Sequence, residues 1–99
     1  MPADRLRTPE VDELLQAFLA LENAEETYAF LQDVATIKEI QDMAQRFHVA
    51  ALLASGEHYN HIRDVTGASA TTISRVSKAL NYGADGYRTV LARLHTEKR

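Results

Sequence analysis

Hydrophobic residues recur three or four positions apart along most of the chain, which is the spacing of one face of an α-helix. Residues 11–21 and 28–34 keep this spacing, and a longer run over 37–52 keeps it as well. The apolar side of that longer run consists of Ile37, Ile40, Met43, Ala44, Phe47, Ala51 and Leu52. Because no segment alternates apolar and polar residues as a strand does, the pattern predicts an all-α chain.

Capping residues set where the first three helices begin. Thr8-Pro9-Glu10 combines a hydroxyl cap, proline at the first helical position and an acid in the first turn. Asn23 with Glu26, and Thr36 with Glu39, have the spacing of capping boxes. The sequence therefore predicts three helices before residue 56.

Glycines divide the rest of the chain. Gly56 ends the third helix, and Gly67 separates a short helix over 58–66 from a helix that Ser69 caps. Asn81-Tyr82-Gly83 is a stop signal. Asp85 is placed to cap a last helix over about 84–97, followed by a basic end, Lys98-Arg99, that suits its dipole. The prediction is about six helices.

The segment over 59–82 reads as a helix-turn-helix, with Ile62 and Val65 facing inward from its first helix. On a helical wheel of the second helix, Ile73, Val76 and Leu80 fall on the side that faces the core. The opposite side carries hydroxyls first and cations later. This is how a helical protein presents a rigid probe to the major groove of DNA.

Each exposed position of this segment suggests a different contact with DNA. Residues at the start of a recognition helix lie nearest the base edges, whereas later cations and the preceding helix reach phosphates. The candidates for base contacts are Ser69, Ala70, Thr71 and Ser74. The candidates for backbone contacts are Arg75 and Lys78, together with Tyr59, Asn60 and Arg63 from the preceding helix.

The charge distribution favours the second half of the chain as the DNA-binding part. The net charge is −3, but residues 1–47 carry four basic and ten acidic residues. Residues 48–99 carry seven basic and four acidic residues, and all four histidines. Since the local field decides where a polyanion docks, this split keeps nucleic acid as the expected partner, with few phosphate contacts per subunit.

Residues 36–87 resemble the Trp repressor superfamily, and within it the small Trp-repressor-related proteins of the YerC/YecD type. The segments that carry the resemblance are Thr36-Ile37-Lys38-Glu39-Ile40, Gln45-Arg46-Phe47, Val49-Ala50, Thr66-Gly67-Ala68-Ser69, Thr72-Ile73-Ser74-Arg75-Val76, Leu80-Asn81-Tyr82-Gly83 and Asp85-Gly86-Tyr87. The resemblance implies an intertwined all-helical homodimer and a DNA-binding transcriptional regulator. It divides one domain, residues 1–99, into dimerisation helices (1–55), the helix-turn-helix (58–82) and a C-terminal helix (84–97).

The resemblance also implies an effector pocket. In Trp repressors two arginines and two threonines hold tryptophan, and the matching residues here are Arg46, Arg75, Thr36 and Thr72. Val76 stands where the repressors have glycine, and Ala79 where they have serine. Because extra bulk in a tight slot is costly, we expect no dependence on tryptophan. The two arginines then hold another anion or make structural ion pairs.

Other function classes have less support. A helical dimer that binds protein instead of DNA is the main alternative, and the acidic first half favours it. His58 and His61 have a ligand-compatible spacing, but no cysteine or carboxylate set completes a metal site. No catalytic motif is present, so we expect no enzyme and no cofactor. The chain has neither a secretory signal nor an apolar run of membrane-spanning length, which predicts a cytoplasmic protein.

Overall fold

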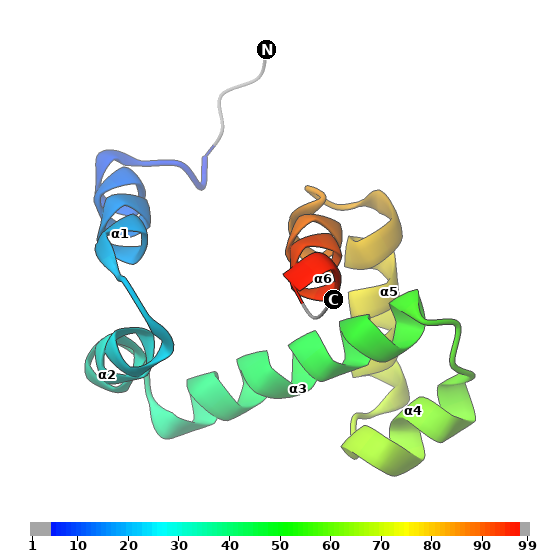
Figure 1. Ribbon diagram of the computed structural model, residues 1–99. Coiled ribbons are helices and arrows are strands. Elements are labelled where there is room, and N and C mark those ends of the chain that lie inside the picture. The colour runs from blue at the N-terminus through cyan, green and yellow to red at the C-terminus, as the bar shows by residue number, and fades with distance from the viewer. Residues whose placement is uncertain (1–4, 98–99) are drawn as a thin grey trace. The chain divides into compact units, whose positions relative to one another are not determined.

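The computed structural model describes residues 5–97, which contain six α-helices (Figure 1). They are α1 (Pro9–Ala20), α2 (Ala24–Val34), α3 (Ile37–Ala54), α4 (Tyr59–Thr66), α5 (Ala70–Tyr82) and α6 (Gly86–Glu97). No strand occurs within these residues, so the all-α prediction is confirmed. The expected basic end, Lys98-Arg99, lies outside the described residues. None of the six helices combines the length and apolar character that spanning a membrane requires.

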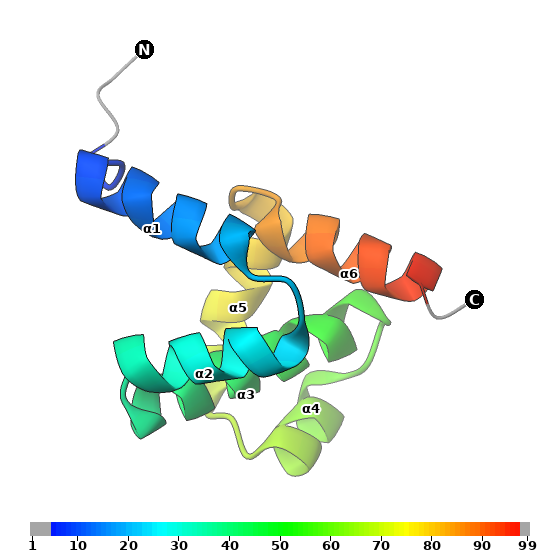
Figure 2. The same ribbon diagram turned by 60° about the vertical axis from the view of Figure 1, so that its left-hand side comes forward.

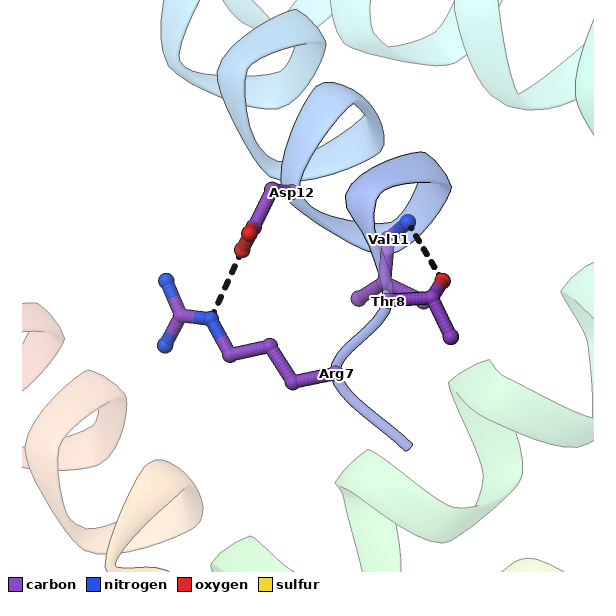
Figure 3. Close-up of polar contacts among 4 residues, drawn as sticks. All are labelled: Arg7, Thr8, Val11 and Asp12. Carbon is purple, nitrogen blue, oxygen red and sulfur yellow. Dashed lines mark hydrogen bonds and ion pairs between the residues drawn. The ribbon is translucent and has the colours of Figure 1, made fainter. Parts of the chain in front are cut away.

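The predicted cap opens α1. Thr8 Oγ1 accepts a hydrogen bond from the backbone N–H of Val11 at 3.2 Å (Figure 3). Beside it, Arg7 Nε donates to Asp12 Oδ1 at 2.7 Å, so a cation neutralises an acid of the first turn. Both side chains of this pair are more than half exposed, so it contributes little to stability.

The capping box at α2 differs in one bond from the expected form. Asn23 Oδ1 accepts from the N–H of Glu26 at 2.9 Å, as predicted. Glu26 Oε1 accepts from the N–H of Glu22 at 2.9 Å, which lies one residue before the cap. The two bonds still satisfy two donors at the helix start, which is the purpose of the motif.

The chain forms two compact units, one ending at Ile37 and the other beginning at Lys38. In the first unit, α1 and α2 meet through the rings of Phe18 and Phe30, which pack edge to face with centroids 5.3 Å apart. Neither helix buries a residue, and Leu19 is 76% exposed. The apolar face predicted for these helices therefore exists but is only partly covered.

The second unit contains the hydrophobic core. Its buried residues come from α3, α4, α5 and the α4–α5 turn: Val49, Ala50, Ile62, Ala68, Ile73, Val76 and Leu80. Leu52, Leu53, Tyr87 and Leu91 pack against this cluster. The wheel prediction for α5 is confirmed, since all three of its inward residues are among them. Figures 1 and 2 both show α5 crossing α3, with α4 at one end and α6 at the other (Figure 2).

On α3 the fully buried residues are Val49 and Ala50, which are not among the residues of the predicted apolar side, while Ile37 on that side is 77% exposed. On α4 the expectation that Val65 faces inward was wrong, because Val65 is 49% exposed. Three residues turn a helix by about 300°, so Val65 sits about 60° from the buried Ile62, at the edge of the packed face.

Candidate nucleic-acid interface

The turn between α4 and α5 depends on a left-handed glycine. Gly67 has φ of 73°, and its N–H donates to the carbonyl of Arg63 at 2.9 Å. This conformation strains any residue with a side chain, which explains why glycine stands here. Gly56 has the same role at the end of α3, with φ of 87°. Both glycine stops were predicted correctly.

Polar groups from two segments hold the turn in place. Thr66 Oγ1 donates to the carbonyl of Ile62 at 2.7 Å and accepts from the N–H of Ala68 at 3.1 Å. Gln45 Nε2, from α3, donates to the carbonyl oxygen of Thr66 at 3.1 Å. Sequence reasoning assigned no role to Gln45, because a hydrogen bond to a distant backbone carbonyl leaves no local pattern. These bonds fix where α5 starts relative to α3 and α4.

The hydroxyl of Ser69 caps α5, as predicted. Ser69 Oγ accepts from the N–H of Thr72 at 3.1 Å and donates to Thr72 Oγ1 at 3.1 Å. The cap satisfies a backbone donor that the first turn of a helix leaves without a partner. It also places two hydroxyls together at the N-terminus of α5.

The outward face of α5 is exposed to solvent. Ala70, Thr71, Ser74, Arg75 and Lys78 are all exposed. Within residues 5–97 the polar side chains among them have no hydrogen bond or ion pair. Hydroxyls near the helix start and cations one to two turns later are therefore available to a ligand.

The α4 residues expected to reach phosphates, Tyr59, Asn60 and Arg63, are exposed. Tyr59 is half exposed, and Asn60 Oδ1 accepts from Arg63 Nη2 at 3.3 Å. His61 Nε2 lies 3.5 Å from Glu57 Oε1, an ion pair when the imidazole is protonated. His58 precedes α4 without a side-chain capping bond. The described residues contain no group of three potential metal ligands.

An arginine and a glycine support the far end of α5. Arg88, from α6, donates through Nε to the carbonyl of Leu80 at 3.1 Å and through Nη2 to Asn81 Oδ1 at 2.8 Å. Gly83 passes so close to the carbonyl of Ala79 that a Cβ would collide with it.

Asp85 precedes α6 with φ of 66°, and its carbonyl accepts from Thr89 N–H at 3.0 Å. Its side chain makes no capping bond, unlike the expectation, because a cap side chain requires an extended backbone.

Two hollows flank α5 in the second unit. The first, of about 410 Å³, is polar and is lined by Lys38, Asp42, Gln45, Arg46, Ser69, Thr72 and Arg75. The second, of about 520 Å³, is apolar and is lined by Phe47, Ala79, Ala84, Gly86, Tyr87 and Val90. The rings of Phe47 and Tyr87 lie 6.4 Å apart at its wall.

The residues that the family resemblance assigned to one effector pocket do not all lie in the same hollow. Arg46, Thr72 and Arg75 line the polar hollow. Ala79 lines the apolar one, and Val76 is buried in the core. Thr36 belongs to the first unit.

Comparison with known proteins identifies the family of this fold. Residues 9–95 match the family profile of the Trp repressor protein. YerC of Bacillus subtilis (strain 168), described as uncharacterized, is 48% identical over 94 residues, or 95% of this chain and 90% of YerC. The crystal structure of a TrpR like protein from Eubacterium eligens ATCC 27750 is 48% identical with a TM-score of 0.88, covering 92% of this chain and 94% of that one. A solved structure from Staphylococcus aureus is 43% identical with a TM-score of 0.89, covering 96% and 95%. This chain belongs to the Trp repressor family, a family of helix-turn-helix DNA-binding regulators.

Proposed function

We propose that this protein is a sequence-specific transcriptional repressor that reads a palindromic operator as a homodimer in the cytoplasm. The outward face of α5 carries the proposal. It presents unpaired hydroxyls at its start and unpaired cations later, on a helix whose position is set by the core and the turn. A rigid helix with free polar groups suits the major groove.

Each residue of this interface has a proposed role. Ser69, Ala70, Thr71 and Ser74 approach base edges, where short side chains allow close contact and a threonine methyl can touch a thymine methyl. Phosphate contacts come from Arg75 and Lys78, and from Tyr59, Asn60 and Arg63 on α4. Phosphate contacts fix the register of the protein on the duplex without reading its sequence.

A two-fold dimer explains apolar surface that one chain leaves uncovered. The large apolar residues that stay more than one third exposed on α1, α2, α3 and α6 are Leu14, Leu15, Phe18, Leu19, Tyr28, Val34, Ile37, Met43, Val90 and Leu94. The apolar hollow beside α5 adds to this surface. Surface of this extent marks an interface, and a palindrome needs a two-fold symmetric reader. We expect half-sites about 34–36 Å apart.

Selection of bound sequences from a random DNA pool, followed by affinity measurement at several salt concentrations, tests the proposal. A preferred palindrome bound with strong salt dependence is the expected result. Equal affinity for all sequences at low salt contradicts it. That outcome favours the alternative of a protein-interaction module, which the acidic residues of α1 and α2 support.

A further inference from the structure

The C-terminal end of α5 obtains a positive charge from the next helix. Its last turn contains no basic residue, although a helix C-terminus carries partial negative charge and leaves its last carbonyl groups without backbone donors. Arg88 of α6 supplies both the charge and a donor, because its Nε donates to the carbonyl oxygen of Leu80 at 3.1 Å. The neighbouring carbonyl of Ala79 accepts from the N–H of Gly83 at 2.9 Å. Arg88 therefore acts together with Gly83 to cap this end of α5.

The same guanidinium group orders a side chain on α5. Its Nη2 donates to Oδ1 of Asn81 at 2.8 Å. Asn81 Nδ2 in turn donates to the carbonyl oxygen of Ser77 at 2.9 Å, one turn earlier on the helix. A planar guanidinium group donates in fixed directions, so the contact restricts the direction of α5 relative to α6 as well as the distance between them. A lysine ammonium group, a point charge on a flexible stem, does not impose that direction.

Arg88 is unfavourably placed for the stability of its own helix. It lies in the first turn of α6, which contains no acidic residue, and a cation at a helix N-terminus opposes the helix dipole. When a sequence breaks a local rule of this kind, the reason lies elsewhere in the structure. Here the same charge is favourable at the end of α5.

Polar contacts therefore hold α5 at both ends. Before its start, Gln45 of α3 donates to the carbonyl of Thr66, and at its other end Arg88 joins it to α6 (Figure 1). These bonds are directional, whereas hydrophobic packing is not. Val90 and Leu94 of α6 belong to the exposed apolar surface assigned above to the dimer interface. The Arg88 contact links that surface to the helix assigned to DNA reading.

We propose that Arg88 is a positioning residue for DNA recognition, which fixes the direction of α5 and thereby the half-site spacing that the dimer accepts. The inference rests on the proposed function. The helix rises about 1.5 Å per residue, so about 16 Å separates Ser69 from Leu80. Without Arg88, a change of about 10° in the direction of α5 displaces one end relative to the other by about 3 Å, close to one base-pair step of about 3.4 Å. A helix with that freedom tolerates half-sites one base pair nearer or farther apart.

Operators that differ only in half-site spacing test the proposal. The full-length protein is titrated with the operator and with two versions that have one base pair added or removed between the half-sites. The wild type loses affinity on either change, and Arg88→Ala makes that loss about tenfold smaller, as expected when charge-assisted hydrogen bonds are removed. A residue needed only for stability would lower the affinity for all three operators by one common factor. An unchanged ratio of affinities in a folded, dimeric Arg88→Ala variant overturns the proposal.

Two further variants make the assignment specific. Arg93→Ala removes an exposed arginine farther along α6 and keeps the spacing preference of the wild type. Arg88→Lys keeps the charge at the end of α5, so it folds even where Arg88→Ala does not, but it lacks the fixed directions of the guanidinium group. It therefore also relaxes the spacing preference. A lysine variant with the full preference of the wild type overturns the directional role.

Nuclear magnetic resonance without DNA separates this inference from the proposed function. Residual dipolar couplings of backbone amides report the direction of α5 relative to α3, α4 and α6. One alignment describes all four helices in the wild type, and in Arg88→Ala the couplings of α5 alone depart from it. Couplings of α5 that stay unchanged in Arg88→Ala overturn the positioning role. If the wild type binds no operator, the proposed function fails, and the couplings still decide whether Arg88 orients α5.

Discussion

Gln45 of α3 donates a hydrogen bond from Nε2 to the backbone carbonyl oxygen of Thr66, 3.1 Å away and 21 residues later in the chain. The bond is partly buried and reaches the last residue of α4, immediately before the turn. Gln45 also lines the polar hollow. One side chain thus touches both the helix-turn-helix and the candidate effector site.

Removing this amide is expected to loosen the turn. Gln45→Ala leaves the carbonyl of Thr66 without its side-chain donor and lowers the free energy of unfolding by about 1–2 kcal/mol. Urea denaturation measures the change. The control is Gln41→Ala, an exposed glutamine on the same helix, which stays within about 0.5 kcal/mol of the wild type. Equal stability of the two variants contradicts a structural role for the bond.

The Ser69 cap of α5 is expected to add about as much to the free energy of unfolding as one hydrogen bond does. Ser69→Ala removes the acceptor for Thr72 N–H and costs about 1 kcal/mol of unfolding free energy. Ser69→Asn keeps a capping oxygen, so it retains nearly wild-type stability by thermal unfolding. If both variants lose the same stability, the serine acts through packing or through its hydroxyl bond to Thr72 instead.

Gly83, which follows α5, and Gly86, which begins α6, are expected to respond in opposite directions to alanine. In Gly83→Ala the new Cβ meets the carbonyl of Ala79, and relieving that collision moves the end of α5. We expect a loss of about 1–3 kcal/mol. Gly86 has open space around it and lies in the first turn of α6, so Gly86→Ala gains about 0.5–1 kcal/mol. Thermal unfolding of both variants measures these changes in stability. A Gly83→Ala variant as stable as the wild type contradicts the steric argument.

The helices were predictable because their signals are local. Caps at Thr8, Asn23 and Ser69, and glycines at the ends of α3 and α4, act within one turn of the backbone. The inward side of α5 was predictable for a related reason, since only one side of that helix is apolar. On α3 two sides carry apolar residues, and periodicity alone does not tell which of them packs inside the chain.

The candidate site was only partly predictable. The reading face of α5 followed from the wheel, because the residues opposite a buried stripe must point outward. The grouping of Arg46 with Arg75 and Thr72 came from family resemblance, since no periodicity relates α3 to α5. Lys38 and Asp42 have the i, i+4 spacing of an ion pair on one helix, but only the structure shows that Arg46 and Arg75 line the same hollow without a partner among residues 5–97.

Two substitutions on α5 are expected to separate base reading from phosphate contact. Lys78→Ala weakens binding to all sequences and lowers the slope of log affinity against log salt by about 0.9 per contact, hence about 1.8 per dimer. Thr71→Val keeps the slope but loses about 1–3 kcal/mol of discrimination at one base pair in each half-site. Affinities for the operator and a single-site mutant, measured over a range of salt, test both. A sequence-independent effect of Thr71→Val removes it from the base-reading set.

A charge on the exposed side of α1 is expected to disrupt the proposed dimer. Leu19 is 76% exposed in the single chain although it continues the apolar side of the helix. In Leu19→Glu a buried interface would have to desolvate a carboxylate, so sedimentation should show monomers, or an unfolded chain, at concentrations where the wild type is dimeric. Gln16→Glu adds the same charge to an exposed polar position of the same helix and keeps the dimer. A dimeric Leu19→Glu variant of normal stability would exclude this side of α1 from the interface, because an isolated carboxylate is not buried without a partner.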